Sequence, residues 1–156
     1  MNSSYRVRTA CVEDLLAVLR LYEHSPTLEQ DTISGRQRDM WQRMMATDDL
    51  TVYVAETDGE VVGTSCLLVM PNLTYDCCPT AFIEAVVVAD AHRRRGVARM
   101  MLGRLLDDAR SMSCRKVQLL THKRHAGDGA HDLYRSCGFE AEAEGFRLYL
   151  DPAGVL

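Results

Sequence analysis

One strand–helix–strand unit constrains the fold more than any other feature of this chain. A nearly continuous apolar run from Ile83 to Val88, interrupted by Glu84, predicts a central strand buried on both faces. Residues 95–112 repeat apolar side chains at helical spacing, and residues 116–121 form a second buried strand. Two strands joined through a helix predict a right-handed parallel crossover, so this helix covers one face of a sheet.

The remaining segments alternate between helix and strand patterns and extend this sheet. The expected strands span residues 5–8, 51–56 and 61–70, the last two joined by an Asp58-Gly59 turn. A first helix presents a stripe of Val12, Leu15, Leu16 and Leu19, and others span 34–46 and 131–137, the last ended by Gly138. A final hairpin is expected over residues 139–142 and 146–150. The order β-α-α-β-β-β-α-β-α-β-β predicts an α/β (mixed α+β) chain with helices on both sheet faces.

Composition limits the class of protein. The 156 residues predict a single domain over 1–156, and a net charge of −4 argues against nucleic acid as a partner. No apolar run reaches membrane-spanning length, which predicts no membrane partner and a cytoplasmic protein. The six cysteines have no C-x-x-C spacing, so we expect free thiols and no zinc site.

The loop before the long helix has the composition of an anion site. It reads Ala91-His92-Arg93-Arg94-Arg95-Gly96-Val97-Ala98-Arg99. A helix N-terminus offers unpaired N–H groups and partial positive charge, and glycine lets a phosphate approach the backbone. The glycine spacings of ATPase and dinucleotide loops are missing. By itself, a solvated arginine-rich turn explains the segment equally well.

Three segments together resemble the GCN5-related N-acetyltransferases (GNAT). Arg93, Gly96 and Ala98 match the family signature [Gln/Arg]-x-x-Gly-x-[Gly/Ala], after a strand and before a helix. Residues 83–88 resemble the family's fourth strand, and residues 133–139 resemble its Tyr-x-x-x-Gly-Phe ending. The resemblance implies the GNAT fold, a central mixed, mostly antiparallel sheet of six to seven strands flanked by about four helices. It also implies acetyl-CoA as cosubstrate.

The resemblance implies a role for each matching segment. Backbone amides of the fourth strand would pair with the pantetheine arm, and the following loop would hold the pyrophosphate. Tyr134 would contact the cofactor and protonate the departing sulfur, although a tyrosine packed on the core is the ordinary alternative. The implied cofactor-binding residues are Val86, Val87, Val88, Arg93, Arg94, Arg95, Gly96, Val97, Ala98, Arg99 and Tyr134.

Glu84 is the candidate base. Many family members place a carboxylate at this point, and burial in an apolar strand would make a carboxylate more basic. The alternatives are that Glu84 faces solvent or pairs with an arginine, and that His122 serves as base. A further departure is Gly127, where many relatives carry asparagine; Asp128 is a possible substitute. A metal cluster among His122, His125 and His131 is less favoured than polar loop residues.

The sequence therefore predicts an acetyl-CoA-dependent N-acetyltransferase that modifies a primary amine of a small molecule. Acetylation of protein lysines or N-termini is one alternative, and a non-catalytic acyl-CoA-binding regulatory module is another. A homodimer is possible, because final strands in this family often pair across subunits. Candidate acceptor-binding residues are Tyr22, Arg36, Arg38, Trp41, Asn72 and Tyr75.

Overall fold

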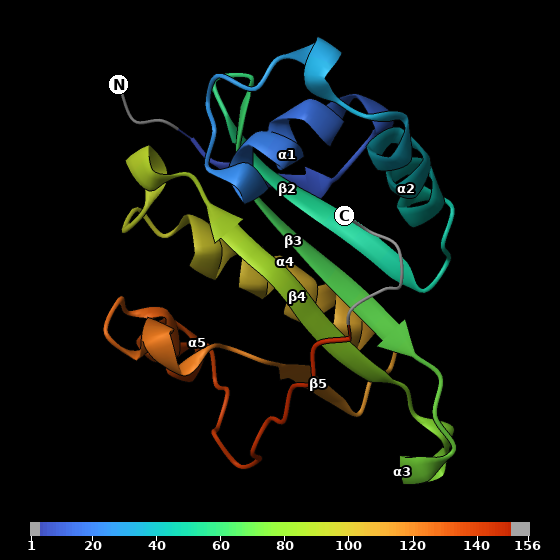
Figure 1. Cartoon of the computed structure of the whole chain (residues 1–156). Coiled ribbons are helices and arrows are strands. Elements are labelled where there is room, and N and C mark those ends of the chain that lie inside the picture. The colour runs from blue at the N-terminus through green and yellow to red at the C-terminus, as the bar shows by residue number, and fades with distance from the viewer. Residues whose placement is uncertain (1–3, 151–156) are drawn as a thin grey trace. The chain divides into compact units, whose positions relative to one another are not determined.

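The computed structural model describes residues 4–150, apart from the side chains at positions 124 and 126. The chain forms two compact units, one ending at Leu119 and the other beginning at Leu120. Figure 1 labels the helices and strands of both units. The first unit holds the sheet and most of the helices, and the second holds the C-terminal helix.

The first unit is built on a five-stranded sheet with the order β1-β2-β3-β4-β5. Neighbouring strands are antiparallel except β4 and β5, which are parallel, as the predicted crossover requires. The strands are β1 Arg6–Thr9, β2 Leu50–Thr57, β3 Glu60–Met70, β4 Thr80–Val88 and β5 Lys116–Leu119.

Helices lie on both faces of this sheet (Figure 1). Val52 and Val54 of β2 pack with α1 and α2, whereas the adjacent Ala55 packs with α4, because successive strand residues point to opposite faces. None of the described helices is both long and apolar enough to span a bilayer. The helices of the first unit are α1 Leu15–Glu23, α2 Gly35–Met45, α3 Thr74–Cys77 and α4 Val97–Ser111, with single 3-10 turns at Val12–Asp14, Gln30–Thr32 and Asp90–His92.

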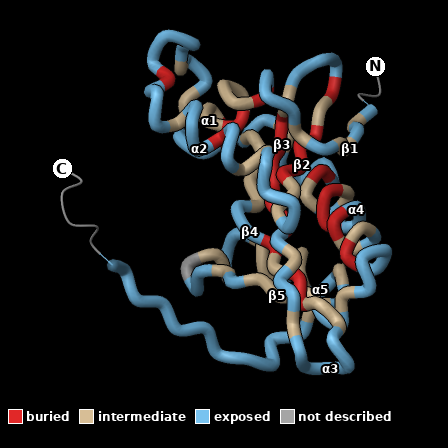
Figure 2. Tube along the Cα trace, turned by 90° about the vertical axis from the view of Figure 1, so that its right-hand side faces the viewer, coloured by how far each residue is buried: buried red, intermediate tan, exposed pale blue. Residues whose placement is uncertain are grey.

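The core follows the predicted face of α4 and departs from the predicted face of α1. Met101, Leu102 and Leu105 are fully buried, each contributing about 1.5–3 kcal/mol of transfer free energy. Figure 2 shows the buried positions along β2, β3 and α4. In α1 the buried residues are Val18 and Leu21, and Val12 is exposed in the 3-10 turn before the helix. The predicted α1 stripe is confirmed at Leu15, which packs against the core, and wrong at Val12, because the α-helix begins only at Leu15.

The predicted turn is confirmed in the β2–β3 hairpin. Asp58 and Gly59 both have positive φ, 51° and 80°, as a two-residue hairpin turn requires. Gly63 lies in β3 where a Cβ atom would meet the Met101 sulfur at 3.0 Å and the Val87 carbonyl at 3.3 Å. A side chain at this position would therefore require the Met101 side chain and the Val87 carbonyl to shift.

The second unit contains the 3-10 turn Lys123–Ala126 and α5 Ala130–Ser136, which confirms the predicted C-terminal helix. Gly138 follows it with φ 90°, as a helix-ending glycine does. The predicted final hairpin is wrong, because the described residues 139–150 form no strand. Residues 140–150 are all exposed, and a hairpin that buries no apolar face is marginal in water. The described sheet therefore has five strands, fewer than the six to seven predicted.

Candidate active site

Strand β4 is paired on both sides for only the first part of its length. Its residues Thr80–Ile83 pair with β5, and β5 ends at Leu119. The remaining residues, Glu84–Val88, pair with β3 alone among the strands of the first unit. One edge of this part of β4 therefore has no strand partner in the first unit, and we call Glu84–Val88 the open half of β4.

A β-bulge marks the start of the open half. Glu84 pairs with Cys66 and Val87 pairs with Thr64, so three steps along β4 match two steps along β3. Ala85 takes up the extra residue in the left-handed region, with φ 54°, which costs an L-residue about 1–2 kcal/mol. Next to it, the Ser65 hydroxyl donates to the Glu84 carbonyl over 3.2 Å. The bulge redirects the strand where its pairing with β5 stops.

The direction of the backbone amides beyond the bulge follows from two hydrogen bonds. The Ala89 N–H donates inward to the Val62 carbonyl of β3 over 2.8 Å. The Val88 carbonyl instead accepts from Arg93 Nε over 3.2 Å, on the side away from β3. Because peptide groups alternate along a strand, the N–H groups of Val88 and Val86 face the open edge, and that of Val87 faces β3.

The burial predicted for this segment is wrong beyond Ile83. Ile83 is 1% exposed, but Glu84 and Ala85 are exposed and Val86 to Val88 are half-buried. A strand buried on both faces needs neighbours along its whole length, and β5 is too short to cover the open half. Glu84 therefore presents its carboxylate to solvent, and the buried environment expected to make it more basic is not found.

Glu84 stands beside two neutral polar groups on the face that carries α1. Its cross-strand partner Cys66 is buried, and burial raises the pKa of the Cys66 thiol, an effect to which the Glu84 charge adds. The Tyr22 hydroxyl of α1 interacts with the side chains of Cys66 and Thr64, and burial raises the pKa of Tyr22. Both groups stay protonated near neutral pH, so the side chains beside Glu84 on this face are neutral.

The N-terminus of α4 follows the open half and offers backbone donors. Gly96 is its N-cap with φ 82°, and among the described residues no side chain caps it. The first α-helical bond runs from Met100 N–H to the Gly96 carbonyl, so the amides of Val97, Ala98 and Arg99 precede the helical ladder. These donors and the positive end of the helix dipole suit a phosphate group.

The three consecutive arginines of the loop have different surroundings. Arg93 ties the loop together, because its guanidinium pairs with Asp90 at 2.9 Å and donates to the Val88 carbonyl. Arg94 and Arg95 are exposed, and Arg94 adopts a left-handed backbone with φ 62°. Arg93 thus shapes the loop, while Arg94 and Arg95 carry its outward positive charge.

A contact that no local sequence pattern indicated joins this loop to the residue before β1. The Tyr5 hydroxyl lies 3.1 Å from His92 Nδ1, and the two rings meet edge to face with centroids 5.9 Å apart. Tyr5 precedes the first strand, far from His92 in sequence, and neither residue belongs to a local pattern that indicates the pair. Contacts of His92 and Arg93 therefore hold the arginine loop in place.

Tyr134 belongs to the second unit, where it packs on Phe139. Their ring centroids are 6.1 Å apart with an interplanar angle of 75°, and the Phe139 N–H donates to the Tyr134 carbonyl over 3.1 Å. The Tyr-x-x-x-Gly-Phe frame thus forms a local turn through Gly138. The structure groups Glu84 with Val86–Val88 and the arginine loop in the first unit. The role of Tyr134 as cofactor contact and acid stays a prediction.

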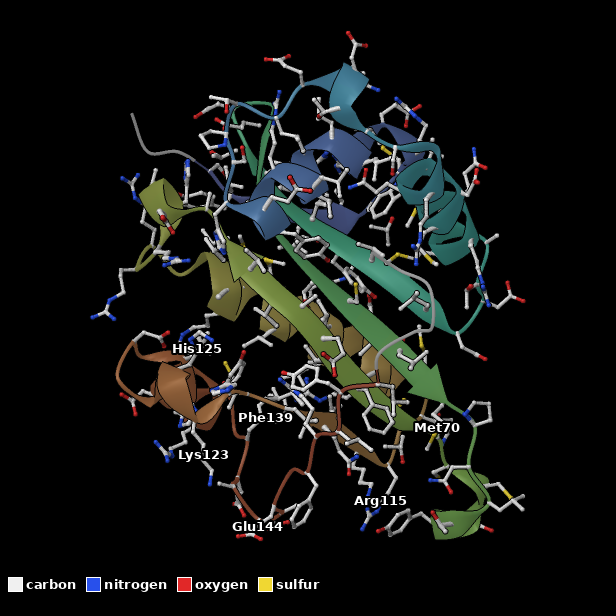
Figure 3. All side chains as sticks on the ribbon, in the orientation of Figure 1. Met70, Arg115, Lys123, His125, Phe139 and Glu144 are labelled. Carbon is white, nitrogen blue, oxygen red and sulfur yellow. The ribbon has the colours of Figure 1, made fainter. Side chains whose placement is uncertain are left out.

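Asp128 and the histidines surround the start of α5. Asp128 accepts from the Ala130 N–H over 3.1 Å and pairs with the His125 ring, which Figure 3 labels. The His122 ring meets His125 edge to face. Asp128 therefore helps begin the helix, and its substitution for a cofactor-binding asparagine is untested. Within the part of the chain that the structure describes, no three metal-binding side chains cluster.

The candidate acceptor-binding residues separate into core and surface positions. Trp41 is 4% exposed and its ring N–H donates to the Val12 carbonyl, so its assignment to an acceptor surface is wrong. The Asn72 side chain holds the turn before β4 through Thr74 and Thr80. The remaining candidates have exposed surface and keep their predicted role: Tyr22, Arg36, Arg38 and Tyr75.

Comparison with known proteins agrees with this geometry. Residues 9–139 match the model of the acetyltransferase (GNAT) family. A solved structure from Agrobacterium tumefaciens str. C58, assigned to the acetyltransferases, is 34% identical and superposes with a TM-score of 0.83 over 93% of this chain and 99% of that one. Glucosamine 6-phosphate N-acetyltransferase 1 of Oryza sativa subsp. japonica is 28% identical over 95% of this chain and 88% of its own length.

A third similarity concerns the fold of a protein solved with the cofactor. Aminoglycoside N-acetyltransferase AAC(6')-Iy in complex with CoA is 20% identical, with a TM-score of 0.75 over 97% of both chains. The family match covers most of the chain, including β4, the arginine loop and the Tyr-x-x-x-Gly-Phe turn. This chain is an acyltransferase that belongs to the acetyltransferase (GNAT) family.

Proposed function

We propose that the protein transfers the acetyl group of acetyl-CoA to a primary amine of a small molecule. The observation that carries this proposal is the open half of β4, which the arginine loop connects to the N-terminus of α4, an end that no described side chain caps. An extended arm with amide groups and a pyrophosphate at its end has the chemistry that these two features bind. CoA has that composition, and the GNAT family uses acyl-CoA.

The proposed fit to CoA rests on backbone N–H donors along β4 and at the start of α4. The outward N–H groups of Val86 and Val88 would bond the thioester carbonyl and the pantetheine amides, as an added strand does. The amides from Gly96 to Arg99 would receive the pyrophosphate, with Arg94 and Arg95 adding charge. Arg93 would act mainly by holding the loop closed on Val88.

The chemistry then needs one base and one acid. A free alkylamine is mostly protonated near neutral pH, so the Glu84 carboxylate would first attract it and then accept its proton, directly or through water. The neutral nitrogen attacks the thioester carbon, the C–N bond forms and the C–S bond breaks. Tyr134 would give its proton to the departing sulfur and would be reprotonated, directly or through water, by the second proton that the new amide nitrogen loses. Acceptor and carboxylate would meet on the α1 face, beside Tyr22 and Cys66.

Amino sugars are the acceptor class to test first. The rice relative is named for glucosamine 6-phosphate, and the CoA complex with the same fold is an aminoglycoside enzyme. Arg36 and Arg38 of α2 are exposed, and their positive charges are compatible with an anionic group on the acceptor.

The test is thiol release from acetyl-CoA across a panel of amines. The panel contains glucosamine 6-phosphate, an aminoglycoside, a polyamine and lysine-bearing peptides, with hydrolysis in the absence of amine subtracted. We expect turnover on at least one small amine that exceeds turnover on every peptide. Turnover on peptides alone would favour protein acetylation, and saturable acetyl-CoA binding without turnover on any amine would favour a regulatory module.

A further inference from the structure

A pair of cysteines lies at the paired end of β4 and β5, away from the open half. Cys78 precedes β4 by two residues, and Cys114 precedes β5 by two residues. Both thiols are free and half-buried, while the neighbouring Cys77 is exposed. No part of the proposed acetyl transfer uses them.

The strand register places these two cysteines opposite each other. Thr80 pairs with Lys116 in the parallel ladder, and the Arg115 N–H donates to the Pro79 carbonyl over 2.8 Å, which continues the ladder toward the strand starts. One further step back along both chains sets Cys78 beside Cys114. Neighbouring strands lie about 4.8 Å apart, within the Cα separation of roughly 4.4–6.8 Å that a disulfide spans.

The two thiols also share an environment. Burial raises the pKa of the Cys114 thiol, and the nearby Cys78 raises it further, which agrees with the register. Directly opposite residues of parallel strands point to the same face of the sheet, so neither side chain has to cross the backbone to reach the other.

The α3 turn, which ends directly before Cys78, is exposed to solvent. Three successive residues of the turn, Tyr75, Asp76 and Cys77, have positive φ of 52°, 57° and 60°, and all three are exposed. The Arg115 guanidinium and the Lys116 ammonium lie 5.8 and 5.5 Å from the centre of the Tyr75 ring. Figure 3 labels Arg115 at this end of the sheet. Two positive charges beside the turn favour the approach of an anionic disulfide such as oxidised glutathione.

We propose that Cys78 and Cys114 form a reversible disulfide by exchange with a low-molecular-weight disulfide. The Cys78 thiolate attacks one sulfur of the reagent, whose S–S bond breaks and releases one thiol. The Cys114 thiolate then attacks the Cys78 sulfur of the mixed disulfide and releases the second thiol. Two protein thiols are oxidised and one reagent disulfide is reduced to two thiols, so atoms and electrons balance.

The cross-link closes the chain segment that holds β4, α4 and the loop between them. It constrains the unfolded chain, and a loop of this length predicts a rise in Tm of about 5–10 °C. It also fixes the strand ends that are already paired, while the open half of β4 lies within the closed loop and away from the bridge itself.

The experiment treats the full chain with oxidised glutathione and digests it with trypsin and chymotrypsin without reduction. We expect peptide 111–115 linked to peptide 76–82 through Cys78, a loss of two free thiols per chain, and reversal by a reductant. Cys77→Ser should keep the link and the rise in Tm. Cys78→Ser and Cys114→Ser should each lose both.

The outcome that would overturn the proposal is read on the unmutated chain and does not depend on any variant folding. It is a link from Cys114 to Cys77 or Cys66, or separate glutathione adducts on Cys78 and Cys114 without an intrachain link. A Cys77→Ser protein that no longer forms the cross-link would overturn it as well.

Discussion

The two halves of β4 use one strand for two purposes. The half paired with β5, Thr80–Ile83, has three of its four residues buried and supports the sheet. The open half, Glu84–Val88, has no buried residue and presents a carboxylate and outward amides. The boundary is the bulge at Ala85, one residue after the acidic side chain. A strand can thus be rigidly held at one end and available to a ligand at the other.

The largest difference between the halves should appear in stability. Ile83→Ala removes a fully buried side chain and should lower the free energy of unfolding by about 3 kcal/mol, whereas Val87→Ala should cost about 1 kcal/mol. Denaturant unfolding measures both. Equal losses at the two positions would contradict the division of β4 into a supporting and an open half.

Turnover, unlike stability, should depend mainly on the open half of β4. Glu84→Gln removes the proposed base, and kcat at pH 7 should fall by about 10²-fold, with a smaller loss near pH 10, where the amine deprotonates unaided. The control is Glu60→Gln at the exposed start of β3. A pH–rate profile that matches the unmutated protein would place the base elsewhere, with His122 the next candidate.

The proposed acid, Tyr134, lies in the second unit. Tyr134→Phe should lower kcat by about tenfold and leave the KM for acetyl-CoA within twofold, because a thiolate already leaves more readily than most groups. The exposed Tyr149, changed to Phe, serves as control. Unchanged turnover would remove Tyr134 as the acid and leave it a packing partner of Phe139.

Charge beside the open half should affect binding more than chemistry. Changing Arg94 and Arg95 together to Gln should raise the KM for acetyl-CoA by about fivefold to tenfold at low salt, with kcat unchanged and the effect reduced by added salt. Arg110→Gln, in the last turn of α4, is the matched control. A KM that stays constant would mean that the backbone amides alone hold the pyrophosphate.

The smallest expected effect is a change in stability at Ala85, the bulge residue between the two halves of β4. Ala85→Gly should raise the free energy of unfolding by about 0.5–1 kcal/mol, because glycine adopts positive φ without a Cβ clash. The same change at Ala81, in the paired half, should lower stability by about 1 kcal/mol. Shifts of the same sign at both positions would argue against a left-handed residue at the bulge.

Local patterns predicted much of this division. The apolar spacing of α4, the Asp58-Gly59 turn and the parallel strands around α4 are all set by nearby residues, and all three predictions are confirmed. The loop signature likewise led to the family. These features need only local backbone and periodic burial, which the sequence states directly.

The errors arise where the outcome depends on distant partners. The exposure of Glu84 depends on where β5 ends, and nothing within Ile83–Val88 indicates that point. An alanine carries no sign of a left-handed bulge, and Arg93 resembled its neighbours until its bonds to Asp90 and Val88 were seen. The final hairpin was predicted over residues 139–142 and 146–150, but a hairpin is stable only where one face is buried.

Residue-level amide hydrogen exchange, with and without acetyl-CoA, tests the central claim most directly. If the cofactor pairs with the open half of β4, exchange should slow by at least about tenfold at Val86 and Val88, whose N–H groups face the open edge. Val87, which faces β3, and the paired residues Thr80–Ile83 should not change. Saturating acetyl-CoA that leaves Val86 and Val88 exchanging at their original rates would contradict the account.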